Sequence, residues 1–99
     1  MDKGVSHEQK KTIIYFIKKY FPNSKIFFFG SRHRGDHKKY SDLDLCIQEQ
    51  AALDLIVLSK LKEELSQSNL PFQVDLSDWH RITPEFQKLI KANSEEWCI

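Results

Sequence analysis

The chain has 99 residues, of which 40% are hydrophobic and 12% are aromatic, so a single globular domain over residues 1–99 is expected and extensive disorder is excluded. Its 15 basic and 14 acidic residues leave a net charge of +1, which gives no strong signal for nucleic-acid binding. The sequence has no apolar run long enough for a membrane span and no signal peptide, and its two cysteines are far apart. This combination predicts free thiols and a cytoplasmic location.

The N-terminal third predicts a helix and then a strand. Ser6 and Gln9 have the form of a capping box, and the apolar residues that follow recur with helical spacing as far as Phe21. Pro22 ends this helix. Residues 25–29 are apolar on both faces, which indicates a strand that is covered on both sides.

The next segment predicts a short helical turn, a loop and a second strand. Gly30 ends the first strand, and Gly35 is expected to end a helical turn, either in a left-handed conformation or at a close approach of the backbone. Residues 36–41 form a polar loop. Residues 42–47 then alternate between polar and apolar, which predicts a strand with one buried face and one face open to a site.

The second half predicts a helix over residues 51–66, a strand over residues 72–76, and a last helix that begins at Thr83 and Pro84. This order of elements predicts an α/β domain with a small mixed sheet flanked by helices. The apolar tail over residues 97–99 is consistent either with packing on its own domain or with an interface, to a partner or within a homodimer.

Two carboxylates on the second strand indicate metal binding. Asp42 and Asp44 are two residues apart, so they point to the same face of the sheet. Two such charges about 4 Å apart repel by about 4 kcal/mol at an effective dielectric constant near 20, so either one is protonated or a cation lies between them. Carboxylates together with a substrate phosphate are a usual way to hold Mg²⁺. Asp75 would join them if its strand is adjacent, while Asp78 competes for that role and would also suit a turn.

A Gly-Ser step at the end of a buried strand predicts phosphate binding. Gly30 lets the backbone approach a phosphate, and Ser31 offers a hydroxyl and an N–H group. Arg34 either pairs with a phosphate or bridges to an acidic residue, and Ser41 either caps a turn or contacts a phosphate. The loop before the two aspartates is rich in basic residues and is either a cationic rim or a solvated loop; these residues are Arg32, His33, Arg34, His37, Lys38 and Lys39. His80 and Arg81 are candidates for the acceptor side.

This pattern resembles the minimal nucleotidyltransferase (MNT) family of the polymerase-beta-like superfamily. The resemblance is carried by Gly30-Ser31, ten intervening residues and Asp42-Leu43-Asp44, with Asp75 as the expected third carboxylate, and it extends over roughly residues 10 to 90. It implies a polymerase-beta-like nucleotidyltransferase core. It also implies that Asp42 and Asp44 bind the Mg²⁺ that bridges the triphosphate of ATP. Asp75 would then either complete a second metal site or act as the general base.

Small MNT proteins are often paired with a HEPN-domain protein in toxin–antitoxin modules. The resemblance therefore implies transfer of AMP from ATP to a hydroxyl group of a protein acceptor, a HEPN toxin. Two alternatives stay open: an antitoxin that neutralises its partner by binding alone, and a nucleotidyltransferase for small molecules. The clustered carboxylates favour catalysis over binding alone, and the short chain leaves little room for a small-molecule pocket.

Overall fold

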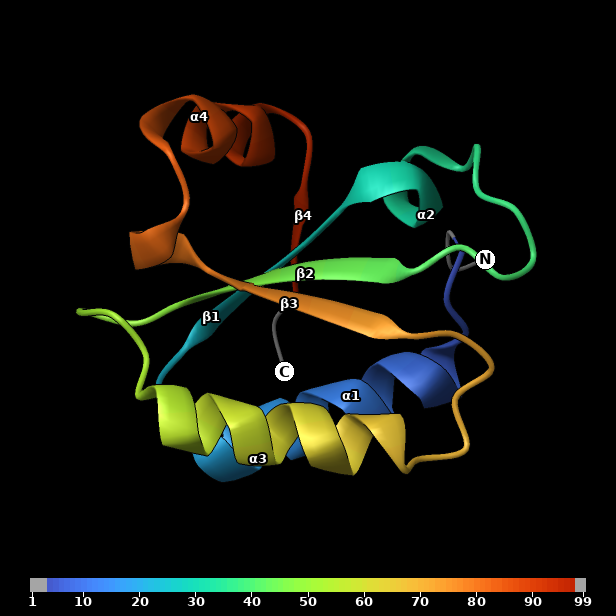
Figure 1. The fold of residues 1–99 in the computed structure, drawn as a ribbon. Helices are drawn as coiled ribbons and strands as arrows, with labels where there is room; N and C mark the ends of the chain where they lie inside the picture. The colour runs from blue at the N-terminus through green and yellow to red at the C-terminus, as the bar shows by residue number, and fades with distance from the viewer. Residues whose placement is uncertain (1–3, 98–99) are drawn as a thin grey trace.

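A four-stranded sheet separates two groups of helices in the computed structural model, which describes residues 4–97 (Figure 1). The strand order is β3-β2-β1-β4; β1 is antiparallel to β2 and β4, whereas β2 and β3 are parallel. The strands are β1 (Lys25–Phe29), β2 (Leu43–Gln48), β3 (Val74–Asp78) and β4 (Glu95–Trp97). The predicted mixed sheet flanked by helices is confirmed.

Helices cover the two faces of the sheet unequally. One face is covered by α1 (His7–Tyr20) and α3 (Leu55–Ser66), which lie below the sheet in Figure 1. The short helix α2 (Gly30–Arg34) and the helix α4 (Pro84–Ala92) lie above it, and the 3₁₀ turn η1 (Trp79–Arg81) leads from β3 into this layer. The site discussed below lies on this upper face.

Local capping fixes where the longer helices begin. The Ser6 hydroxyl accepts from the Gln9 N–H and the Gln9 side chain accepts from the Ser6 N–H, so the predicted capping box of α1 is present. The helix α3 begins at residue 55 rather than at residue 51, because the carboxylate of Asp54 accepts from the N–H groups of Ile56 and Val57.

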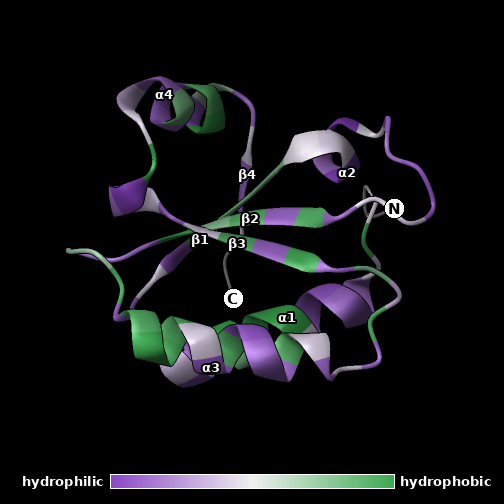
Figure 2. Cartoon of the chain, viewed as in Figure 1, coloured by the Kyte–Doolittle hydropathy of each residue, from purple (hydrophilic) through white to green (hydrophobic). Residues whose placement is uncertain are grey.

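The core has two parts, one on each side of the sheet. The larger part joins α1 and α3 to the lower face of the sheet, and its largest fully buried members are Ile13, Ile17, Ile26, Phe28, Leu43, Leu45, Ile47, Leu53 and Leu61. The smaller part joins Cys46, Trp79 and Ile90, with Phe27, Phe29 and Phe86 packed against it. The expectation that the Cys46 face of β2 is open to the site is therefore wrong for Cys46, which is fully buried. The polar residues Asp44 and Gln48 lie on either side of Cys46 on this face and are only partly buried. Figure 2 shows hydrophobic and hydrophilic residues following one another along β2.

The C-terminal segment forms a strand that the sequence patterns did not predict. β4 pairs with β1, and Trp97 lies opposite Ile26 in the register. Trp97 is only 3% exposed, and its ring centroid lies 5.1 Å from that of Phe28. Of the two alternatives for the apolar tail, packing on its own domain is correct for Trp97, whereas Cys98 and Ile99 lie outside the described residues.

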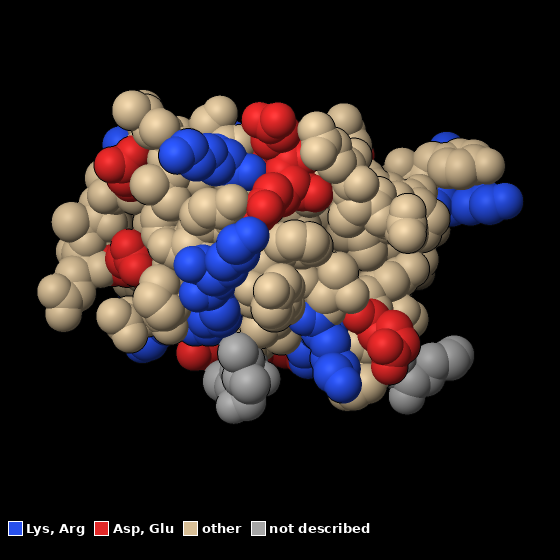
Figure 3. All heavy atoms as spheres, turned by 90° about the horizontal axis from the view of Figure 1, so that it is seen from below, with Lys and Arg blue, Asp and Glu red and all other residues tan. Residues whose placement is uncertain are grey.

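The surface of α1 and α3 carries charges of both signs (Figure 3). Lys19 of α1 and Glu64 of α3 form an ion pair across the two helices, with 3.0 Å between Nζ and Oε1. No helix within residues 4–97 combines the length and the apolar character that crossing a membrane would require.

Candidate active site

The strand register brings two of the three predicted carboxylates directly together. β2 and β3 are parallel neighbours, and Asp44 lies opposite Asp75. Asp42 precedes β2 at a position two residues from Asp44, so the three side chains belong to the same face of the sheet. Asp78 instead lies opposite Ile47, so the register brings Asp75, and not Asp78, to Asp44.

The pKa of Asp44 responds both to its burial and to the neighbouring carboxylates. Partial burial, the negative charges of Asp75 and Asp42 and a hydrogen bond with Asp75 raise the pKa of Asp44 to about 6, while the positive charge of Arg34 opposes the shift. Repulsion of this kind disfavours a cluster in which all carboxylates are charged. Binding of either a proton or a cation therefore stabilises the cluster.

Gly30 brings the backbone against this cluster. It adopts a left-handed conformation with φ of 83°, and a Cβ atom on residue 30 would lie 2.1 Å from Oδ2 of Asp44. Glycine is therefore required both by the backbone conformation and by the close approach to Asp44. α2 starts here, and its N-cap residue Phe29 makes no side-chain capping hydrogen bond, so the first N–H groups of the turn remain open to a ligand.

Gly35 ends α2 as predicted. Its φ is 90°, and its N–H donates to the carbonyl oxygen of Ser31 at 2.9 Å. A left-handed glycine at this position is the usual way to stop a helix. Ser31 is therefore held in the first turn of α2, next to Gly30.

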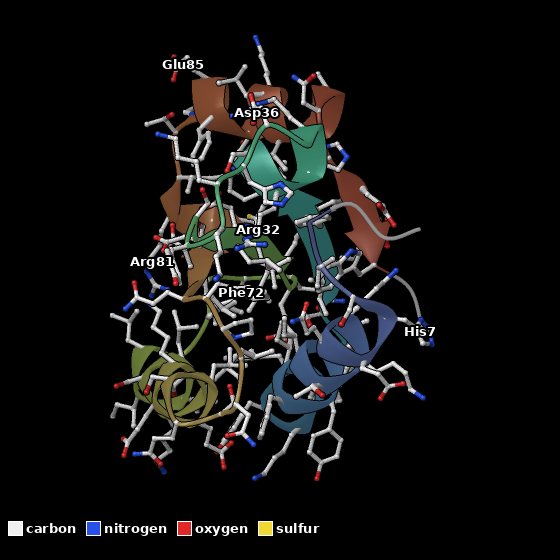
Figure 4. The ribbon with its side chains drawn as sticks, turned by 90° about the vertical axis from the view of Figure 1, so that its right-hand side faces the viewer. His7, Arg32, Asp36, Phe72, Arg81 and Glu85 are labelled. Carbon is white, nitrogen blue, oxygen red and sulfur yellow. The ribbon has the colours of Figure 1, made fainter. Side chains whose placement is uncertain are left out.

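Arg32 does not belong to the predicted cationic rim, because it is buried. It is 5% exposed and donates to three backbone carbonyl oxygens: that of Gly4 at 2.7 Å, that of Ser41 at 2.8 Å and that of Lys39 at 3.0 Å. Its guanidinium also lies over the ring of Phe72, 4.3 Å from the centroid, and the two side chains face each other in Figure 4. Burial lowers the pKa of Arg32, and the nearby charge of Asp42 partly opposes this effect. Arg32 thus fixes the loop that leads into Asp42.

Arg34 and Ser41 each contact another residue of the chain, which is the predicted alternative to contacting a phosphate. Nε of Arg34 lies 3.3 Å from Oδ2 of Asp36, and both side chains are largely exposed. The Ser41 hydroxyl accepts from the N–H of Lys38 at 2.9 Å, so it caps the turn before β2. Of the basic residues in the predicted rim, Arg34, Lys38 and Lys39 are exposed, and the charge of Arg34 acts on Asp44.

His33 is also only partly available to a ligand. Its ring packs edge-on against the ring of Phe28, with 5.5 Å between the centroids. This contact orients the ring towards the core rather than fully towards solvent. The predicted rim is therefore smaller than the run of basic residues suggests, because Arg32 is buried and His33 is partly packed.

Asp78, His80 and Arg81 form a structural cluster at the other end of β2. Asp78 is 5% exposed and accepts from the N–H of Leu53 at 2.8 Å, from the N–H of His80 at 3.1 Å and from the Arg81 guanidinium at 2.5 Å. Nε2 of His80 lies 2.6 Å from the carbonyl oxygen of Glu49. These contacts hold the loop after β2, so they favour a structural role for His80 and Arg81 over the candidate role on the acceptor side.

The residues of the site fit a magnesium ion that shares its ligands with a substrate. Within residues 4–97, no three side chains of His, Cys, Asp or Glu are arranged to hold a metal ion by themselves. Mg²⁺ normally takes only one or two carboxylates and completes its octahedron with water and substrate phosphates. The adjacent carboxylates of Asp44 and Asp75, with Asp42 beside them, suit this mode of binding.

Comparison with known proteins places this geometry in a family. The sequence model of the polymerase beta nucleotidyltransferase family matches residues 11–96. A Haemophilus influenzae protein with the name "Probable protein adenylyltransferase MntA" is 37% identical over 87 residues, which cover 88% of this chain and 76% of that protein.

Two solved structures are similar at 25% sequence identity. One is a toxin–antitoxin complex with AMP-PNP, with a TM-score of 0.77 over 91% of this chain and 73% of that chain. The other is a complex of a tri-AMPylated Shewanella oneidensis HEPN toxin with its MNT antitoxin, with a TM-score of 0.69 over 91% of this chain and 70% of that chain. The chain belongs to the polymerase beta nucleotidyltransferase family, as the Gly-Ser step and the paired aspartates predicted.

Proposed function

We propose that this chain transfers AMP from ATP to a hydroxyl group of a partner protein, a HEPN-domain toxin, and thereby acts as an antitoxin. The observation that carries the proposal is the pairing of Asp44 with Asp75 in the sheet register, directly beside Gly30. The name of the Haemophilus influenzae relative and the AMPylated toxin in one similar complex support it.

The triphosphate would lie over Gly30 and the start of α2. The open N–H groups of this turn and the Ser31 hydroxyl would donate to phosphate oxygens. Lys38 and Lys39 are exposed in the loop between α2 and β2. The ion pair between Arg34 and Asp36 is exposed, and such pairs contribute only about 0–1 kcal/mol. A phosphate could therefore displace Asp36 from Arg34 at little cost.

The carboxylates would hold magnesium together with the phosphates. Asp42 and Asp44 would bind one ion, and Asp75 would complete the site for a second. Magnesium, when bound, would neutralise charge on the transferred phosphoryl group. The chain itself contributes rigid placement, because β2 and β3 fix Asp44 and Asp75 by hydrogen bonds of the sheet and Arg32 holds the loop that leads into Asp42.

The proposed reaction is a displacement at the α-phosphorus of ATP. The acceptor hydroxyl oxygen forms a new bond to phosphorus while the bond from that phosphorus to the pyrophosphate oxygen breaks. The proton of the hydroxyl passes to the carboxylate of Asp75, which is exposed at the site. The pKa of Asp44 is raised to about 6 in the metal-free site, so the cluster gains stability from a cation that neutralises part of its charge.

Labelled ATP tests the proposal. Purified protein, Mg²⁺ and ATP labelled at the α-phosphate are incubated with lysate of the source cell, beside a control with Asp42→Asn and Asp44→Asn that circular dichroism shows to be folded. We expect label on a discrete protein band that is absent in the control. No label on protein, RNA or small molecules with any of the four nucleotides would favour an antitoxin that acts by binding alone.

A further inference from the structure

A groove of about 720 Å³ opens beside the carboxylates, on the side of β3. Asp42, Asp75 and Tyr40 line its end at the site, and Lys62 and Ser66 of α3 line its far wall. We propose that this groove binds the hydroxyl-bearing segment of the partner protein, in an extended conformation along the outer edge of β3. This inference rests on the proposed function and names where its acceptor binds.

The groove lies on the side of the carboxylates that the phosphates leave free. In the strand order β3-β2-β1, Gly30 follows β1 and Asp75 is on β3, so Asp44 of β2 lies between them. The attacking and leaving oxygens lie roughly in line on opposite sides of the phosphorus. If the pyrophosphate leaves over Gly30, the hydroxyl has to arrive from the β3 side, where the groove opens.

The backbone of β3 offers unused hydrogen-bonding groups along this groove. β3 is an edge strand whose pairing partner among the described strands is β2. The Leu43 N–H donates to the Gln73 carbonyl oxygen at 2.8 Å, and Leu43 lies opposite Val74. Because alternate residues of a parallel strand bond to the same neighbour, the N–H and C=O groups of Val74 and Leu76 point away from β2. An extended segment can add to such an edge.

The charges along the groove select the kind of segment. Lys62 is exposed on the far wall, and no hydrogen bond or ion pair holds it among residues 4–97. The opposite end of the groove carries the negative charges of Asp42 and Asp75. A segment that presents a hydroxyl residue to these carboxylates and an acidic side chain to Lys62 would match both ends. Phe72 and Leu70 supply apolar contact between them.

A charge reversal on α3 tests the assignment. Lys62→Glu is compared with Lys60→Glu, a matched change at an exposed position of the same helix that does not line the groove. Initial rates of AMP transfer are measured against the concentration of the acceptor protein that labelling identifies, and separately against ATP. We expect Lys62→Glu to raise KM for the acceptor about tenfold, with KM for ATP within about twofold of wild type, and Lys60→Glu to change neither constant.

The other outcomes separate the two proposals. If the wild-type chain transfers AMP and Lys62→Glu has the wild-type KM for the acceptor, the groove assignment is overturned and the proposed function stands. A rise in the KM for ATP alone would also overturn it, because the groove would then hold the nucleoside. If the wild-type chain transfers no label, the proposed function itself fails, and the groove has no acceptor to bind.

Discussion

At Gly30 the backbone approaches Asp44 so closely that no side chain fits between them. The left-handed φ of 83° already favours glycine, and the 2.1 Å between a hypothetical Cβ and Oδ2 of Asp44 excludes any larger residue without movement of the carboxylate. Gly35 has a similar φ of 90° but no atom within 4 Å of a Cβ at that position. Substitutions at both positions would strain the backbone, but only a substitution at Gly30 would also displace Asp44.

We predict that Gly30→Ala and Gly35→Ala each lower the free energy of unfolding by about 1–2 kcal/mol, because alanine is strained at positive φ. Only Gly30→Ala should also lower the rate of AMP transfer, by about 100-fold, since it pushes Asp44 out of place. Urea unfolding and the labelling assay check this. An equal loss of activity in both variants would show that strain, and not the position of Asp44, is responsible.

The raised pKa of Asp44 predicts a pH-dependent stability in the absence of metal. The folded protein binds the Asp44 proton more tightly than the unfolded chain does, so the stabilisation is present below pH 3.8 and is lost as the pH rises to about 6. A shift of this size corresponds to roughly 3 kcal/mol, which solvent screening at this half-buried site reduces to about 1–2 kcal/mol.

Urea unfolding in EDTA between pH 4 and pH 8 measures this effect. We expect the wild-type free energy of unfolding to fall by about 1–2 kcal/mol relative to Asp44→Asn over this range. The variant lacks the titrating group and so lacks this part of the pH dependence. Parallel curves for the two proteins would contradict the burial of Asp44 beside Asp75 and Asp42.

Among the elements, those that depend on local patterns were predictable. The capping box at Ser6, the left-handed Gly35 and the alternation over residues 42–47 each determine their own conformation, and each is present. β4 was missed because a three-residue strand exists only through its pairing with β1. The start of α3 was misplaced because the Asp54 cap is one polar residue within an apolar run that continues on both sides.

The burial of Arg32 was likewise hidden, because its partners are backbone carbonyls far apart in the sequence. Its charge suggested a place in a cationic rim or a solvated loop, and nothing nearby in the chain indicates the contacts with Gly4, Ser41 and Phe72. A planar group with five donors is suited to such a divided set of acceptors. The result is a clamp that joins the N-terminal segment, the loop over residues 36–41 and the loop before β3.

We predict that Arg32→Lys lowers the free energy of unfolding by about 2–3 kcal/mol, because a single ammonium cannot reach the three carbonyls that the guanidinium contacts. Arg34→Lys is the matched control and should change it by less than about 0.5 kcal/mol, because Arg34 is exposed. Urea unfolding of both variants measures the difference. Equal stability of the two would contradict the clamp.

For the molecule as a whole, the strand order determines which residues can act together. The lower face of the sheet is core throughout, whereas the upper face is core around Cys46 and open around Asp44. Asp75 and Asp78 are only three residues apart, so both were candidates for the third carboxylate. The parallel register of β2 and β3 places Asp75, and not Asp78, opposite Asp44. That information is tertiary, so the sequence could name both candidates without deciding between them.

Asp75→Asn in the labelling assay tests the central claim, that the Asp44–Asp75 pair is the centre of nucleotidyl transfer, most directly. Asp75 is exposed, so the free energy of unfolding should stay within about 0.5 kcal/mol of wild type. The rate of AMP transfer should fall by at least about 100-fold, because the variant lacks a metal ligand or proton acceptor. A folded Asp75→Asn protein that transfers AMP at nearly the wild-type rate would contradict this claim.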